Sequence, residues 1–125
     1  MEYKRKDRVG DLLHHEISQL LMKGVKDPRI GFVTITGVEV SDDLKEAKVY
    51  YSVIGTDEEK KAAGIGLKSS AGFIRNELRK VLSLRHIPNL HFRFDSSLEY
   101  GARIERILRE VKVEEEVKEE VKEDD

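Results

Sequence analysis

The residues best suited to binding chemistry in this chain are the cations within residues 68–88. That stretch holds five basic side chains against one acidic residue, Glu77, and so carries a net charge of +4. The five are Lys68, Arg75, Arg79, Lys80 and Arg85. Arg75 and Arg79 stand four residues apart, so on a helix they form a stripe beside the apolar side. Guanidinium groups can hold phosphate oxygens in a bidentate manner, which predicts contact with a nucleic-acid backbone.

Two weaker sets of cations accompany this stretch. Arg93, beside His91, is predicted on the outward face of a strand, within reach of a phosphate. Arg5 and Arg8 fall in the first turn of a predicted helix, where cations oppose the helix dipole. An ordinary solvated surface is the alternative for each of these arginines. Few aromatic residues are available for base stacking, and Phe73 is assigned to the core, so recognition of RNA shape and backbone is predicted.

The sequence lacks the usual groups of an enzyme. His14 and His15 are neighbours and would point about 100° apart on a helix, so they cannot share a metal ion. Asp42 and Asp43 are typical turn residues and supply too few oxygens for calcium. The glycine pair at residues 64–66 follows no strand and lacks the Gly-Lys-Ser/Thr ending of a phosphate-binding loop. We therefore predict no catalytic residue, no metal and no cofactor, with a small hydrolase or nucleotide-binding enzyme as the alternative class.

The distribution of charge divides the chain. Its 125 residues hold 23 basic and 25 acidic side chains. Residues 113–125 contain two of the basic and eight of the acidic side chains, which gives them a net charge of −6. Residues 1–112 keep 21 basic and 17 acidic groups, or +4, and are predicted to form one domain, followed by a disordered or frayed acidic tail. The chain has no cysteine, no apolar run of membrane-spanning length and no signal peptide, which predicts a cytoplasmic protein without a membrane partner.

The first half of the chain predicts a helix and a hairpin. Apolar residues recur at helical spacing over residues 3–24, and the pattern ends at a glycine. Residues 33–40 show the alternation of apolar and polar residues typical of a strand. The apolar positions shift by one residue at Gly37, which predicts a bulge there. A turn at residues 41–43 leads to a second alternating strand over residues 47–53.

The second half predicts further helices and a returning strand. Thr56 and Glu59 have capping-box spacing and open a helix, whereas the serines and glycine within residues 69–72 predict a break and a fresh helix start. The helix after the break would bury Ile74, Leu78, Val81 and Leu82. A strand over residues 90–94, a capping box at Ser96 and Glu99, and a last amphipathic helix follow. The predicted fold is α+β, a three-stranded sheet with its helices on one face.

Several blocks of sequence, in this order, resemble the bacterial ribosome-binding factor A family over most of the chain. They are DPRIGFVTITGVEVS at residues 27–41, LKEAKVYYSV at 44–53, SAGFIR at 70–75, LRHIP at 84–88 and FRFDSSLEYGARI at 92–104. The resemblance implies a single type II KH-like domain in which a helical kink of the pattern Ala-x-Gly replaces the usual GxxG loop. The corresponding residues here are Ser70, Ala71 and Gly72, with serine in place of the usual alanine.

The resemblance also implies a function. It implies binding to the free small (30S) ribosomal subunit and its 16S rRNA, support of late processing of precursor 16S rRNA, adaptation to cold, and no catalytic activity. We further expect a monomer without a small-molecule substrate. The rRNA contacts expected are Lys68, Arg75, Arg79, Arg85, Arg93, Arg5 and Arg8. A permanent ribosomal protein or a generic KH-type RNA-binding protein is the alternative.

Overall fold

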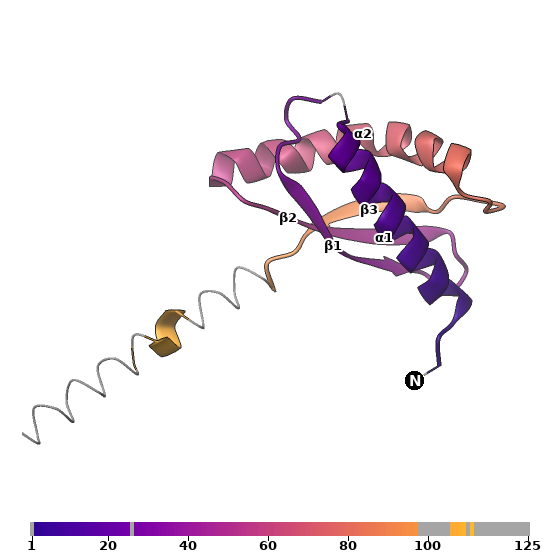
Figure 1. Ribbon diagram of the computed structural model, residues 1–125, viewed down its shortest axis with the longest axis horizontal. Helices are drawn as coiled ribbons and strands as arrows, with labels where there is room; N and C mark the ends of the chain where they lie inside the picture. The colour runs from indigo at the N-terminus through magenta and orange to yellow at the C-terminus, as the bar shows by residue number, and fades with distance from the viewer. Residues whose placement is uncertain (1, 26, 98–105, 110, 112–125) are drawn as a thin grey trace, which may run out of the picture. The chain divides into compact units, whose positions relative to one another are not determined.

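The computed structural model describes residues 2–25, 27–97, 106–109 and 111. Its elements are, in order, α1 (Arg5–Lys23), β1 (Val33–Val40), β2 (Glu46–Val53), α2 (Asp57–Val81) and β3 (Asn89–Phe94) (Figure 1). Contacts divide the chain into two units, Met1–Asp95 and Ser96–Asp125, and the first contains all five elements. Within the second unit, residues 106–109 and 111 are helical. The predicted capping box pairs Ser96 with Glu99, and Glu99 and the acidic tail fall outside the described residues.

Helix α1 follows the predicted apolar spacing and packs on β1. Its inward side chains Leu13 and Ile17 are fully buried, and Val9 is nearly so. The helix is capped by Gly24, which has a φ of 91°, an angle that glycine adopts with little strain. At Gly10 the helix comes so close to β1 that an added Cβ would lie 3.2 Å from the carbonyl oxygen of Val38. None of the helices in the described part of the chain is long and apolar enough to cross a membrane.

The sheet has the order β1-β2-β3, with β1 antiparallel and β3 parallel to the central β2. The bulge predicted at Gly37 is confirmed, because Ile35 pairs with Tyr51 and Gly37 with the preceding Tyr50. Thr36 is therefore the extra residue, and its hydroxyl donates a 2.6 Å hydrogen bond to the Asp95 carboxylate. The shift lets residues on both sides of the bulge face the core.

One face of the sheet is buried and the other is open to water. Along β2, Ala47, Val49 and Tyr51 are buried, while Lys48 between them is exposed. Helices α1 and α2 supply the buried side chains that meet these strand residues. The predicted α+β architecture, with helices on one face of a three-stranded sheet, is confirmed.

Helix α2 is one continuous helix of 25 residues, so the predicted interruption at residues 69–72 is wrong. It begins at the predicted capping box, in which the Thr56 hydroxyl accepts a 3.1 Å hydrogen bond from the Glu59 amide. A single buried stripe runs through the expected break. It comprises Ala63, Leu67, Ser70, Ile74 and Leu78. Gly72 lies on the exposed side, where its cost of about 1 kcal/mol is too small to end a helix held by that stripe.

The continuous helix also corrects two predicted core residues. Phe73 is 53% exposed and Val81 is 59% exposed. Phe73 precedes Ile74 and points about 100° away from it, so it leaves the buried stripe. Val81 is the last helical residue, beyond the last fully buried position, Leu78. An aromatic residue is thus available on the surface of α2.

Two glycines of α2 should respond to alanine in opposite ways. Nothing lies within 4 Å of a Cβ added at Gly72, so Gly72→Ala should raise the free energy of unfolding by about 1 kcal/mol through helix propensity. A Cβ at Gly66 would lie 2.8 Å from Cγ1 of Ile30, so Gly66→Ala should destabilise the protein. Urea denaturation followed by circular dichroism measures both. A loss of stability in Gly72→Ala would contradict the continuous, uncrowded helix.

Candidate nucleic-acid interface

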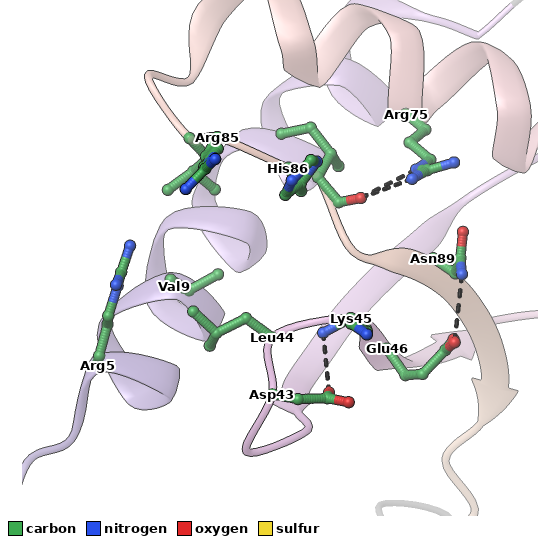
Figure 2. Close-up of a pocket in the computed structure, with 12 residues that line it drawn as sticks. Arg5, Val9, Asp43, Leu44, Lys45, Glu46, Arg75, Arg85, His86 and Asn89 are labelled. Atoms are coloured by element: carbon green, nitrogen blue, oxygen red, sulfur yellow. Dashed lines mark hydrogen bonds between the residues drawn. The ribbon is translucent and has the colours of Figure 1, made fainter.

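A cavity of about 470 Å³ opens where four segments of the first unit meet (Figure 2). The segments are the start of α1, the loop of residues 41–45 between β1 and β2, the second half of α2, and residues 82–88 leading into β3. Its basic lining residues are Arg5, Lys45, Arg75, Arg85 and His86. We call this cavity the basic pocket. It collects cations that are distant in the sequence.

Arg75 holds one wall of the basic pocket in place. Its Nε and Nη2 atoms donate hydrogen bonds of 3.1 and 2.8 Å to the carbonyl oxygen of Ile87, and its side chain is half-buried. Ile87 itself is 2% exposed. The predicted phosphate ligand therefore also has a structural role, since it fastens the segment before β3 to α2.

The two acids that line the basic pocket are already engaged. The Asp43 carboxylate accepts hydrogen bonds from the Ser41 hydroxyl, at 2.7 Å, and from the Lys45 amide, at 3.1 Å. These bonds hold the pKa of Asp43 below its usual range.

Glu46 is engaged in the same way on the other side of the loop. Its carboxylate contacts the ring of His91 and accepts a 3.2 Å hydrogen bond from the side-chain NH₂ of Asn89. Both contacts lower the pKa of Glu46, and the contact with His91 has the larger effect. Neither acid pairs with a pocket arginine. Within the described ranges, the side chains of Arg5, Lys45 and Arg85 have no hydrogen bond or ion pair, although the charge of Lys45 also helps to lower the pKa of Asp43. The charges of Arg5 and Arg85 therefore face the pocket without an acidic partner among the described residues.

Apolar side chains complete the lining of the basic pocket. They are Val9, Leu44, Leu84 and Ile87. Leu44 has a φ of 63°, a left-handed conformation that is unfavourable for leucine. The loop holds it there through a hydrogen bond from the Leu44 amide to the Ser41 carbonyl, at 2.9 Å, while its side chain packs against the core. The pocket thus has a charged rim and an apolar floor.

The structure separates the seven arginines and lysines predicted to contact RNA. It brings Arg5, Arg75 and Arg85 together in the basic pocket. Arg79 donates a 2.7 Å hydrogen bond to the Asn76 side chain and does not line the pocket.

The other three cations lie elsewhere on the first unit. Lys68 lines a shallow hollow with Tyr51 and Phe94, and Arg93 lines another with Lys48. Arg8 is exposed on α1. One continuous basic face does not form from all seven.

Sequence reasoning missed Lys45 and His86 as neighbours of this site. Lys45 follows a turn and His86 precedes a proline, so each looks like an ordinary loop residue. Only the parallel pairing of β3 with β2, which aligns Asn89 with Glu46, brings the two loops to the same end of the sheet. The succession of a strand, a helix and a strand favours parallel pairing, but no local pattern gives the register that aligns the two loops.

Two histidines of the described segments, His14 and His91, make structural contacts. The Nε2 atom of His14 lies 3.0 Å from the carbonyl oxygen of Ile35, and His91 contacts Glu46. No group of three histidine, aspartate or glutamate side chains that could hold a metal ion occurs in the part of the chain that the structure describes. The geometry favours binding of anionic groups.

Comparisons with known proteins point to one family. Residues 5–108 match the family profile described as "Ribosome-binding factor A". The Ribosome-binding factor A of Geobacter metallireducens is 57% identical over 113 residues, which cover 90% of this chain and 96% of that protein.

Solved structures share the fold. A Thermotoga maritima protein, described as a candidate ribosome binding factor A and solved by NMR, is 33% identical with a TM-score of 0.66, over 74% of this chain and 89% of its own. A homology model of Thermus thermophilus ribosome binding factor A, fitted into a cryo-EM map of a 30S complex of that factor, has a TM-score of 0.56 at 20% identity, over 77% of this chain and 97% of its own. At that identity the likeness concerns the fold.

The structural role of Arg75 can be separated from surface charge. Arg75→Ala removes a charged donor from a buried carbonyl and should lower the free energy of unfolding by about 1–3 kcal/mol. Arg79→Ala removes the same charge from an exposed site and should change it by less than about 0.5 kcal/mol. Equal values in urea denaturation would contradict the role assigned to Arg75.

Proposed function

The chain belongs to the ribosome-binding factor A family, and from this premise we propose that it binds the free small (30S) ribosomal subunit as an assembly factor. The observation that carries the proposal is the match over residues 5–108, which spans all five elements of the first unit. We propose further that it supports late processing of precursor 16S rRNA, including growth in the cold, and that it acts in the cytoplasm as a monomer without catalysis. The basic pocket gives such a factor a surface suited to RNA.

The basic pocket is the centre of the proposed rRNA contact. Arg5 and Arg85 present exposed, unpaired guanidinium groups there, while Arg75 reaches the same pocket from α2. Charged donors of this kind form strong bonds to phosphate oxygens. The remaining predicted cations are proposed as outer contacts that add to the electrostatic attraction. They are Lys68, Arg79, Arg93 and Arg8.

The family's helical kink is proposed to correspond to residues 70–72 inside the continuous α2. Ser70 faces the core, and Gly72 lies on the surface. The acidic residues 113–125 are proposed to form a tail separate from the RNA-binding domain of residues 1–112, because a charge of −6 repels phosphate.

Sedimentation with ribosomal particles distinguishes an assembly factor from its rivals. We expect the protein to pellet with isolated 30S subunits and to be absent from translating 70S ribosomes. A permanent ribosomal protein would stay in both particles. Failure to pellet with 30S subunits would overturn the proposal, as would equal binding to an unrelated structured RNA, which a generic RNA-binding protein predicts.

Charge reversal tests the proposed surface. Arg5→Glu combined with Arg85→Glu should weaken 30S binding and reduce the dependence of log K on log salt concentration, by about 1 for each phosphate that the protein no longer neutralises. Both side chains are exposed, so the fold should persist, as circular dichroism can verify. Lys23→Glu is the control for Arg85→Glu alone, because each variant reverses one charge, and Lys23 is exposed at the other end of α1, about 27 Å along the helix from Arg5. Equal weakening by the control variant would contradict the assignment.

A further inference from the structure

The basic pocket combines a cationic rim with an apolar floor, and we propose that it receives a single unstacked nucleotide of the RNA. This inference rests on the proposed function, because it names the form of RNA that the same site accepts. Its volume of about 470 Å³ lies within the range of about 300–1,000 Å³ typical of small-molecule sites. A surface that only followed a duplex backbone would need no such cavity.

The apolar floor argues against a bare phosphate as the occupant. Val9, Leu44 and Leu84 offer aliphatic surface that an inorganic anion cannot use. The flat faces of a nucleobase can use it, and proteins that take a base out of the stack hold it between aromatic or apolar side chains. Inside a duplex the bases are stacked and paired, so only an unpaired or extruded nucleotide can enter.

The polar groups of the pocket are divided in a way that suits the two ends of a nucleotide. In Figure 2, Arg5 and Arg85 stand on one side of the view, and Asn89 and Glu46 stand on the other. The two arginines can take the phosphate. The Glu46 carboxylate is held by His91 and by the side-chain NH₂ of Asn89, which leaves the side-chain oxygen of Asn89 as an acceptor for a base edge on that side.

The walls of the basic pocket are held in place without a ligand. Arg75 fixes the segment before β3 through its two bonds to Ile87, and Asp43 fixes its own loop through Ser41 and the Lys45 amide. A preformed site loses little conformational entropy on binding, which favours capture of a mobile nucleotide.

Binding of short RNAs to the full chain tests the proposal. The probes are a single-stranded RNA hexamer, a hairpin whose stem contains the same sequence and whose loop is a non-nucleotide linker, and inorganic phosphate. We expect the hexamer to bind at least about tenfold more tightly than the hairpin, because a base of the stem must first be unpaired and unstacked before it can enter the pocket. Amide NMR signals of residues 43–46 and 84–87 should shift on addition of the hexamer.

Variants assign the binding to the pocket. Arg85→Glu and Leu84→Glu should each weaken hexamer binding about tenfold, whereas Lys23→Glu should leave it nearly unchanged. The NMR shifts of the unaltered protein test the site even where a variant fails to fold.

Three outcomes would overturn the proposal. They are tighter or equal binding of the hairpin, displacement of the hexamer by phosphate at equal concentration, and NMR shifts located outside the pocket. A protein that still pellets with 30S subunits in any of these cases keeps its proposed function, so the two failures are distinguishable.

Discussion

The structure depends on the need to cover one face of a three-stranded sheet with two helices. Ala47 and Val49 on the central strand are fully buried, and so are Leu13 of α1 and Ile74 of α2. Because α1 packs on β1 and α2 packs mainly on β3, each helix has a fixed position over the sheet. The start of α1, the end of α2 and two loops then meet at one end of the molecule. The basic pocket lies where they meet, so the core positions the site.

The placement of these segments also decides which charged side chains have partners. Asp43 and Glu46 are held by hydrogen bonds within the loops and strands, and Arg75 is held by the Ile87 carbonyl. The arginines without such partners, Arg5 and Arg85, are left on the rim. The overall charge of −2 therefore says little about how the protein meets an anionic partner, because the local arrangement of paired and unpaired groups decides it.

Much of the fold could be predicted from local patterns. The alternation of β2, the bulge at Gly37 and the capping box at Thr56 each depend on residues close in sequence, and the structure confirms them. Residues 69–72 by themselves predict a break in α2. The stripe of buried residues from Ala63 to Leu78 overrides it, because tertiary packing outweighs a single exposed glycine.

The site was less predictable than the fold. Charge density identified Arg75 and Arg85, but the double hydrogen bond of Arg75 and the neighbouring Lys45 arise from contacts between distant segments. Periodicity reports which side of an element is buried. It does not report which loops meet, and that is what makes the pocket.

Site-directed cross-linking to the 30S subunit tests the central claim most directly. The chain has no cysteine, so a single cysteine placed at exposed Ser83, beside the basic pocket, can carry a photoreactive group without competing sites. The account predicts cross-links from this position to 16S rRNA, and none from a cysteine at Met22, which is 81% exposed near the other end of α1. Cross-links to rRNA from Met22 with none from Ser83 would contradict it.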